Sequence, residues 1–510
     1  MSDPRRGLVL AVDLGSGGPK VGYVTVTGEP VWWWHERGDA VGGGAQVQDA
    51  EAWWATVVAA ARRGLAEGVP GHQVVGVAAT GQWASTVPVD ASGHPVGECL
   101  MWSDTRGAEH SAAAFGGPVL GYSPRVLATW LRRSGGVPNP DGADPVAHML
   151  HLERDRPEVS SVAAYYLEPV DYLTMRFTGV AVATPMSMTA AWLTDNRDLA
   201  RVAYDDRLVA LAGVNADRLP PLVPSGSIVG RVLPEVAAEI GIPPHAQVVT
   251  GMPDLHNAAV ASGCVALRRP HLSLGTSAWI SCPVPEKKSD VVRQMASVPG
   301  IGDGRYLLAN NQDNAGRCLE WFRGVAAPEL SYPDLEALAA SASAGSHGVI
   351  FTPWLTGERS PIDDRRARGG FHNVSLSTGR ADLTRAVLEG VALNLRWLLA
   401  GAERFAGTRF DPIRVLGGGA RMDLWCQVLA DVCDRTLERV AEPLTGGLRG
   451  AGLYLGLALG LVTHDELPAL VPVDRVFTPD PATRATYDAL FAELPGLYSR
   501  QKRMFARLNT

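Results

Sequence analysis

Short apolar runs alternate along the chain with longer stretches of helical period. The strand candidates are Gln73–Thr80, Gln247–Thr250, Leu272–Leu274, Tyr306–Ala309, Gly348–Phe351 and Ile413–Leu416. Between Trp425 and Cys433 the apolar positions recur at i, i+3, i+4, i+7 and i+8, which predicts one buried helical face. A similar stripe runs from Leu383 to Leu395. Strands mixed with helices of this length predict an α/β fold.

A glycine-rich turn joins two of the apolar runs near the amino terminus. Leu8–Val12 leads into Asp13-Leu14-Gly15-Ser16-Gly17-Gly18-Pro19-Lys20, and Val21–Val26 follows. Such a hairpin can offer backbone amides to a phosphate, and Asp13 is placed to bind Mg²⁺ directly or through water. An ordinary glycine hairpin is the structural alternative. The sequence contains neither a GxxxxGK[ST] loop nor GxGxxG spacing in this segment.

A related layout lies about half a chain further on. Leu272–Ser277 gives a strand and a Gly/Thr/Ser turn, and the β-prone Ala278–Cys282 follows. Two such hairpins predict two similarly built lobes, with the boundary near residues 262–268. We therefore expect an N-terminal lobe over residues 1–265 and a C-terminal lobe over residues 266–510.

Composition narrows the class of protein. A chain of 510 residues with 46% hydrophobic residues can bury a large interior, and its net charge of −7 lacks the basic footprint of nucleic-acid binding. The longest mainly apolar stretch, Ala451–Val462, is too short to span a bilayer and predicts a buried helix. Six scattered cysteines without a CxxC pair, and a start without a signal-peptide core, predict a cytoplasmic protein with neither nucleic-acid nor membrane partners.

Three local features have simple structural interpretations. Gly42–Gly44 and the glycine- and proline-rich Ser134–Asp144 are typical of surface loops. The Trp32–Trp34 cluster is expected on a strand, where packing is favoured over stacking on a sugar. His148 and His151, with Glu153 nearby, fit a helix face better than a metal site.

Seven segments in order resemble the FGGY family of carbohydrate kinases. They are Asp13–Lys20; Cys99–Arg106, with its Trp-x-Asp-x-Arg pattern; Glu168–Leu173 with Thr178-Gly179; Gly251–Asp254; Leu272–Ser277; Gly357–Pro361 with Ala367–Phe371; and Gly417–Ala420 with Trp425, Gln427, Ala430 and Asp431. The first departs from the family in having Ser-Gly-Gly-Pro where Thr-Thr or Thr-Ser is more usual. The Gly357–Phe371 block is similar to that of xylulokinase-like members.

The resemblance implies two actin-like, RNase H-like lobes with ATP and Mg²⁺ in the cleft between them. A sugar hydroxyl is then the phosphoryl acceptor, and Asp254 is the catalytic base that orients it and takes its proton. From spacing alone, Asp254 is favoured as the N-cap of a helix over Leu255–Ala261; the resemblance favours the base, and one residue can fill both roles.

The resemblance also assigns nucleotide contacts. Asp13 is the metal ligand, and Glu320 occupies a position where relatives can have a polar adenine contact. The ATP-binding residues it implies are Asp13, Gly15, Ser16, Gly17, Lys20, Gly275, Thr276, Ser277, Gly316, Glu320, Gly418, Gly419 and Asp423. For Gly417–Gly419 a strand-to-helix turn requires glycine in any case, so both interpretations hold together.

The expected substrate-binding residues are Gln82, Trp83, Trp102, Asp104, Arg106 and Asp254. An aromatic face can pack on a sugar while charged groups bind its hydroxyls, although Trp102–Arg106 could also be a salt-bridged structural loop. The main departure is Gln82-Trp83-Ala84-Ser85, where xylulokinase-like relatives often have Gln-Met-His-Gly and glycerol kinases have Gln-Arg-Glu. Ala84 thus replaces a polar group that grips the substrate, and the Trp83 ring is expected to fill that space.

These observations predict an ATP-dependent, Mg²⁺-dependent kinase of a sugar hydroxyl, with a ketopentose such as xylulose as the first choice. The alternatives are a kinase of another sugar or polyol, a catalytically weak sugar sensor on the same scaffold, and an actin-like ATPase. The actin-like ATPase leaves the Trp102–Arg106 and Gly357–Pro361 segments without a purpose. The expected partner is a small-molecule sugar or polyol, and a homodimer is an open expectation.

Overall fold

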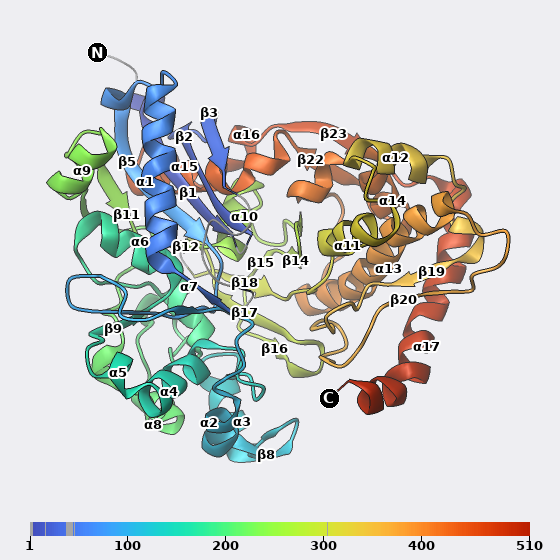
Figure 1. Ribbon diagram of the computed structural model, residues 1–510, viewed down its shortest axis with the longest axis horizontal. Coiled ribbons are helices and arrows are strands. Elements are labelled where there is room, and N and C mark those ends of the chain that lie inside the picture. The colour runs from blue at the N-terminus through green and yellow to red at the C-terminus, as the bar shows by residue number, and fades with distance from the viewer. Residues whose placement is uncertain (1–3, 16, 37–43, 45, 303, 510) are drawn as a thin grey trace.

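The computed structural model describes residues 4–15, 17–36, 44, 46–302 and 304–509. It has two halves that lie side by side, each built on its own β-sheet (Figure 1). The sheet of the first half has seven strands, in the order β10 (Ile228–Arg231), β11 (Gln247–Val249), β5 (Val74–Gly81), β1 (Leu8–Gly15), β2 (Gly18–Thr25) and β3 (Pro30–His35). A seventh strand, β12 (Met252–Pro253), also pairs with β5.

Strand β1 is buried on both faces because the sheet has helices on both sides. Leu8, Leu10 and Val12 pack in a core with Trp53 and Trp54 of α1 (Ala50–Ala66). The alternate residues Val9 and Ala11 belong to a second core, which includes Leu448, Leu453 and Leu455 of α15 (Gly446–Ala458). Alternate residues of the strand point to opposite faces and are buried in two different hydrophobic cores. This explains the nearly continuous apolar run in the sequence.

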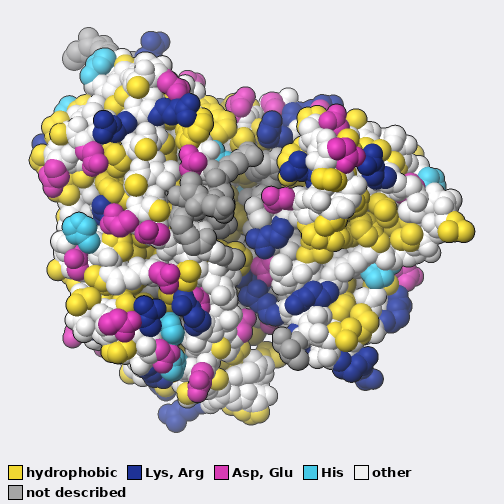
Figure 2. Space-filling model, viewed as in Figure 1, with side chains coloured by type: hydrophobic (Ala, Val, Ile, Leu, Met, Phe, Trp, Pro, Cys, Tyr) yellow, Lys and Arg dark blue, Asp and Glu magenta, His cyan; other side chains and the backbone are white. Residues whose placement is uncertain are grey.

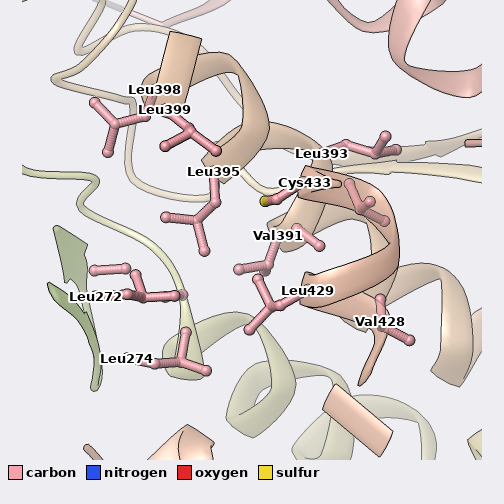
Figure 3. Packing of buried hydrophobic residues seen from close by; sticks show 14 of the residues in the cluster. Leu272, Leu274, Val391, Leu393, Leu395, Leu398, Leu399, Val428, Leu429 and Cys433 are labelled. Carbon is pink, nitrogen blue, oxygen red and sulfur yellow. The ribbon is translucent and has the colours of Figure 1, made fainter. Parts of the chain in front are cut away.

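The sheet of the second half has five strands, in the order β14 (Ala278–Ser281), β13 (His271–Leu274), β21 (Ile413–Leu416), β22 (Leu437–Val440) and β23 (Val473–Phe477). Around it lie α11 (Gly316–Ala326), α12 (Tyr332–Ala340), α13 (Arg380–Ala406), α14 (Asp423–Cys433) and α17 (Arg484–Leu508). Figure 3 shows Leu272 and Leu274 of β13 facing Val391 and Leu395 of α13 and Leu429 of α14. The two helical stripes predicted from the sequence thus form the core of this half.

A smaller antiparallel sheet and a helical segment complete the molecule. The sheet runs in the order β15 (Pro283–Val284), β18 (Tyr306–Ala309), β17 (Met295–Pro299) and β16 (Ser289–Asp290). The helical segment comprises α2 (Ala108–Phe115), β8 (Gly116–Val119), α3 (Pro124–Arg133) and α4 (Pro145–Asp155), and it has its own core. The two are tied together where Lys287 Nζ donates to the Leu131 carbonyl over 2.7 Å.

Helix α15 joins the two halves. By chain order it belongs to the second half, but it packs on β1 and β2 of the first and lies against α10 (Asp254–Ala261). The contacts are close because α15 carries glycines: a Cβ on Gly452 would lie 2.5 Å from a methyl of Val24. The predicted buried helix at Ala451–Val462 is present as far as Ala458, where α15 ends. A boundary at residue 265 assigns α15 to the second half, although it packs on the first. The exact lobe boundary stays a prediction.

Several local predictions can be compared directly with the elements. The Trp32–Trp34 cluster lies on β3 as expected; Trp34 carries the Arg63 guanidinium 3.7 Å from its ring centroid, and Trp32 donates to Glu67 over 2.7 Å. These contacts support packing over sugar stacking. The loop at Gly42–Gly44 lies outside the described residues except for Gly44. Basic and acidic side chains are interspersed on the face shown in Figure 2, as the modest net charge predicts.

Candidate active site

A cavity of about 560 Å³ lies between the two halves. Its walls are lined by Gln82, Trp83, Ala84, Trp102, Leu120, Tyr122, Leu131, Gly135, Gly136, Val137, Asn139, Pro140, Ala143, Asp144, Ala190, Trp192, Asp254, Leu255, Ser277, Trp279, Ser289, Asp290, Val291, Val292, Gln294, Met295, Ala296, Ala309, Asn310, Asn311, Arg359, Ile362 and Asp363. More than half of the lining residues are aromatic or aliphatic and about a third are polar or charged, a mixture that suits a small-molecule site. Of the predicted site residues, Gln82, Trp83, Trp102, Asp254 and Ser277 meet here.

Asp254 is placed at this cavity by the sequence of short elements before it. Strand β12 ends at Pro253, and Asp254 is the first residue of α10. Pro253, rather than Asp254, holds the N-cap position, but the Asp254 side chain still accepts the Leu255 amide over 2.7 Å. Burial raises the pKa of Asp254 to about 7, although the Leu255 amide lowers it, and the charge of Asp13 adds to the rise. Such a carboxyl exchanges a proton near neutral pH.

The first hairpin holds an ion pair beside Asp254. Lys20 Nζ on β2 lies 3.0 Å from Oδ2 of Asp13 on β1. Gly18 has a φ of +116°, which a side chain rarely allows, so glycine is needed to close this turn. Gly17 faces open space, since a Cβ there would have no atom within 4 Å. Gly15 ends β1, and Ser16 lies outside the described residues.

The turn of the second hairpin packs against a glycine at the start of α11. Its turn, Gly275-Thr276-Ser277, leaves Thr276 exposed and Ser277 in the cavity wall. Gly316, the first residue of α11, donates its amide to the Gly275 carbonyl over 2.9 Å, and a Cβ on Gly316 would lie only 2.6 Å from that oxygen. The helix can therefore start against the turn only because residue 316 has no side chain.

The Gly417–Gly419 turn connects β21 to α14 as the sequence predicted. Gly417 has a φ of +101°, and a Cβ on Gly419 would lie 2.6 Å from Leu274 Cγ, so both glycines are needed for packing against β13. Gly418 differs because a Cβ there would meet nothing within 4 Å. Asp423 at the start of α14 pairs with Arg439 over 2.6 Å and with Arg475. Glu320 is exposed on α11.

Gln82 and Trp83 present different groups to the cavity. Gln82 is 3% exposed, and neither its side-chain oxygen nor its nitrogen has a hydrogen-bond partner, so the amide is available to a ligand. The Trp83 Nε1–H instead donates to the Ser187 carbonyl over 2.7 Å. The Trp83 ring therefore supplies an apolar wall beside Ala84, and its filling of the space left by Ala84 stays a prediction.

Trp102, Asp104 and Arg106 do not reach the cavity together. Trp102 lines it, whereas the Asp104 carboxylate is fully buried and pairs with Arg106 over 2.6 Å. Burial opposes ionisation of Asp104, but the Arg106 hydrogen bonds outweigh it and lower the pKa of Asp104. Neither Asp104 nor Arg106 is among the lining residues, and contact of all three residues with a sugar stays a prediction. The pair shapes the loop that presents Trp102, which agrees with the salt-bridged alternative.

Comparison with known proteins decides the family. The N-terminal domain model of the FGGY family of carbohydrate kinases matches residues 8–261, and its C-terminal domain model matches residues 271–459. The chain belongs to the FGGY family of carbohydrate kinases. Curated relatives include xylulose kinases of Staphylococcus epidermidis (26% identity, 99% of both chains) and Klebsiella pneumoniae (30%, 98% of both chains). A gluconokinase of Bacillus subtilis is 25% identical over 72% of both chains.

Solved structures show the same fold. The ligand-bound xylulose kinase of Lactobacillus acidophilus superposes with a TM-score of 0.84 at 21% identity, covering 98% of this chain and 100% of the other. The molecule therefore has the two actin-like lobes of FGGY kinases, and its enzymatic class is carbohydrate kinase, which phosphorylates a sugar. Among the described residues, no helix combines the length and apolar character needed to cross a bilayer.

The segment Ser134–Asp144 is not a surface loop, and that prediction was wrong. Seven of its residues line the cavity of the kinase, including Asn139, and Asp144 is 4% exposed. Asp144 caps α4 by accepting the Ala147 amide over 3.1 Å, and burial raises the pKa of Asp144 to about 7. The Gly and Pro residues correctly predicted an irregular backbone, but they do not indicate whether that backbone lies on the surface or in a cavity wall.

Sequence reasoning also missed three large cavity residues: Trp192, Trp279 and Arg359. Trp279 is the second residue of β14, which follows the second hairpin turn, and its buried Nε1–H has no hydrogen-bond partner. That position was one available signal, and for Arg359 the signal was its place in the Gly357–Pro361 segment that resembles the family. Trp192 and Arg359 come from segments whose approach to the cavity depends on long-range packing.

The histidines considered for metal binding are engaged in hydrogen bonds. His148 contacts Thr86 Oγ1 at 3.2 Å and the Asp104 carbonyl at 3.2 Å. His151 Nδ1 and His110 Nε2 share Oδ2 of Asp155, at 2.8 and 2.6 Å. Ligands around a transition metal at about 2 Å stand further apart than these atoms do. Among the described residues, the group that could hold a metal is His110, His151 and Asp155, and these hydrogen bonds join its members.

Proposed function

We propose that this FGGY kinase transfers the γ-phosphoryl group of ATP, with Mg²⁺, to a hydroxyl of a ketopentose such as xylulose. The observation that carries the proposal is Asp254, a partly buried carboxyl with a raised pKa in the wall of a cavity that the second hairpin turn also reaches. The xylulose kinases among the relatives, which match nearly the whole chain, support the ketopentose.

The residues around the first hairpin fit a metal ion. Asp13 and Asp254 are close enough for the charge of Asp13 to raise the pKa of Asp254, so a cation at Asp13 would relieve this repulsion. Asp13 would hold Mg²⁺ directly or through water, and the ion would neutralise charge on the phosphates. The Lys20 ammonium lies 3.0 Å from Asp13, so the hairpin would carry this positive charge in addition to that of the Mg²⁺ ion.

The second half fits the nucleotide. The exposed Thr276, with Gly275 and Ser277, forms a turn whose amides and hydroxyls suit a phosphate, while Gly316 and Gly419 keep side chains away from it. The open space at Gly418 would allow the adenosine to approach the backbone. Glu320 and Asp423 stay proposed contacts; Asp423 is 47% exposed but is shared with two arginines.

The chemical step assigned to Asp254 is a proton transfer. Oδ1 is occupied by the Leu255 amide, so Oδ2 would accept the proton of the acceptor hydroxyl as that oxygen forms its bond to the γ-phosphorus. The bond to the β-phosphate bridging oxygen breaks, and ADP leaves. The apolar walls at Trp83 and Trp102 exclude water that would otherwise compete for the phosphoryl group.

Charge in the cavity supports a neutral acceptor. Among the described lining residues, the acidic side chains are Asp144, Asp254, Asp290 and Asp363, whereas Arg359 is the one basic side chain. This excess of carboxyl groups disfavours an acceptor that itself bears a carboxylate. Gluconate, which the name of the gluconokinase relative implies, is such an acceptor. Ala84 leaves the reactive end of the acceptor without the polar group expected there, so another ketose or a polyol is the second candidate.

A substrate panel tests this function. The enzyme is incubated with ATP and Mg²⁺ and with pentuloses, hexuloses, polyols or gluconate, and ADP is measured. We expect the highest kcat/KM for a ketopentose and a value at least tenfold lower for gluconate, because an unfavourable buried charge costs more than about 1.4 kcal/mol. Binding of a sugar with no ADP above background for any compound would instead support the sensor hypothesis.

We place the enzyme in the cytoplasm, where ATP is available. All six cysteines are buried and free, as expected for a reducing compartment. Fractionation of the native host checks this placement. A homodimer stays a prediction, and sedimentation of the purified enzyme tests it.

A further inference from the structure

Arg359 brings a donor to the cavity from the second half. Its side chain is 31% exposed, but its Nε–H is buried and has no hydrogen-bond partner. A buried donor without a partner costs about 1–3 kcal/mol, so native proteins rarely keep one unless a ligand or water fills the position. Arg359 lines the cavity, so this donor belongs to a side chain that a bound ligand would contact.

The guanidinium faces an aromatic ring from the other half. Its carbon lies 5.8 Å from the centroid of the Trp102 ring, within the range of a cation–π contact. Trp102 comes from the loop that the Asp104–Arg106 pair holds in place. The two side chains are therefore neighbours in the cavity wall, one from each lobe.

The nearest carboxylate does not satisfy Arg359. Asp313 Oδ1 lies 3.6 Å from Arg359 Nη2, beyond hydrogen-bond distance. That oxygen already accepts from Asn311 Nδ2 over 2.7 Å, and Oδ2 accepts from Arg365 Nη1 over 3.0 Å. Arg365 in turn reaches Asp141 of the first half over 3.3 Å. Asp313 and Arg365 thus form an ion pair with each other, while the Arg359 Nε–H has no hydrogen-bond partner.

The backbone beneath Arg359 is firmly anchored. The Arg359 amide donates to Glu358 Oε1 over 2.9 Å, and the same oxygen accepts the Asp313 amide over 2.9 Å. Oε2 of Glu358 accepts from Asn394 Nδ2 over 2.7 Å. Glu358 is fully buried in this network. The base of the Arg359 side chain is therefore held in place, and its guanidinium is left to reach into the cavity.

We propose that Arg359 binds the acceptor, with its Nε–H donating to a hydroxyl or carbonyl oxygen while the carbon face of the acceptor packs near Trp102. This assignment rests on the proposed kinase function and adds a substrate contact from the nucleotide-binding lobe. A neutral oxygen is the expected partner because the surrounding wall is rich in carboxyl groups. Since Trp102 and Arg359 belong to different lobes, the bound acceptor links the two and helps to keep water out.

Three variants test the assignment. Arg359→Met removes the charge and the donors and keeps much of the length, Arg359→Lys keeps the charge but loses the Nε–H, and Arg366→Met is the matched control. The Arg366 side chain is 58% exposed, and Arg366 is not among the lining residues. KM for the ketopentose, KM for ATP, kcat and ADP release without acceptor are measured for each variant.

We expect Arg359→Met to raise the acceptor KM by roughly tenfold or more, as the loss of a charge-assisted hydrogen bond does. KM for ATP should stay within about twofold, Arg359→Lys should be intermediate, and Arg366→Met should match the wild type. The ratio of ADP to sugar phosphate should rise above one in Arg359→Met, since a poorly held acceptor leaves room for water. A purely structural role would not produce this selective pattern.

An unchanged acceptor KM in folded Arg359→Met would overturn the assignment, as would a rise in ATP KM alone. Thermal unfolding establishes that the variants are folded, and if Arg359→Met is not, the acceptor KM of Arg359→Lys decides. Either negative result would leave the proposed function intact as long as the wild type phosphorylates a ketopentose. If the wild type phosphorylates no sugar, the proposed function fails first.

Discussion

The two hairpins of this kinase have the same topology but different chemistry. In each, a strand pairs antiparallel with the strand that follows its glycine-containing turn and parallel with a strand much later in the chain: β1 with β2 and β5, and β13 with β14 and β21. The first carries the Asp13–Lys20 ion pair. The turn of the second, Gly275–Ser277, contains no ionisable side chain.

The two hairpins also differ in what packs against them: a carboxylate is contacted in the first and a backbone carbonyl in the second. The Asp13 carboxylate lies against the start of α15, where a Cβ on Gly447 would be 2.1 Å from Oδ2. The second turn lies against Gly316, where a Cβ would be 2.6 Å from a backbone oxygen. The first hairpin thus positions a charge and the second positions its backbone. The comparison teaches that one topology can place a charged side chain or an uncharged turn by changing a few turn residues, which matches the two tasks proposed for them, charge neutralisation and phosphate binding.

The largest effect should come from the acid that both hairpins are proposed to serve. Asp254→Asn keeps the shape but cannot accept a proton, so kcat should fall by about 10²–10⁴-fold. ATP binding, measured by calorimetry, should stay within about twofold because neither hairpin is altered. The exposed Glu239→Gln on another helix is the control. Near-wild-type kcat in Asp254→Asn would mean that the hairpins do not serve this acid.

Paired glycine variants separate the two hairpins. Gly316→Ala should raise the ATP KM and lower the free energy of unfolding by about 1–3 kcal/mol, since its Cβ meets backbone that cannot move freely. Gly447→Ala should instead raise the Mg²⁺ concentration for half-maximal rate, because its Cβ displaces Asp13.

The matched control for this pair is Gly324→Ala on α11, whose Cβ would meet nothing within 4 Å. It should leave both kinetic constants unchanged and stabilise the helix slightly. If Gly316→Ala and Gly447→Ala shift ATP and Mg²⁺ dependence equally, the proposed division between the hairpins is wrong.

The pH dependence links the first hairpin to Asp254. A base works when deprotonated, and the pKa of Asp254 is raised to about 7, so kcat/KM for the acceptor should fall about tenfold per unit below pH 7 and level off above it. Asp13 contributes to the rise, so saturating Mg²⁺ should move the midpoint to lower pH. A profile flat from pH 5.5 to 8 would contradict the role of Asp254 as the base.

The smallest effect is expected from the cation of the first hairpin. Lys20→Met removes the partner of Asp13 and one positive charge near the phosphates, so the ATP KM should rise about threefold, as for a partly exposed ion pair. Initial-rate measurements at varied ATP check this. An effect as large as that of Asp254→Asn would show that Lys20 acts in the chemical step.

The strands, helices and hairpin turns could be predicted because their signals are local. Alternating or continuous apolar residues predict β1, β5 and β21, and apolar stripes at i, i+3 and i+4 predict α13 and α14. Asp254 was found because it follows a short strand and precedes a helix within a recognised segment. These elements needed no knowledge of distant contacts.

What could not be predicted depends on long-range packing. The sequence shows Asp104 and Arg106 next to Trp102, but not that their charges face each other rather than the cavity. It shows Ser134–Asp144 as irregular, but not that the segment folds into the cavity wall. The packing of α15 on the first sheet follows from glycine contacts with strands more than 400 residues earlier.

The most direct test of the central claim is to follow the fate of the phosphoryl group by ³¹P NMR. Wild-type enzyme, ATP, Mg²⁺ and xylulose should yield one phosphomonoester for each ADP formed, and Asp254→Asn should yield neither at a comparable rate. Conversion of ATP to ADP and inorganic phosphate without a phosphomonoester, or product formation by Asp254→Asn at the wild-type rate, would contradict transfer to an acceptor hydroxyl at this cavity.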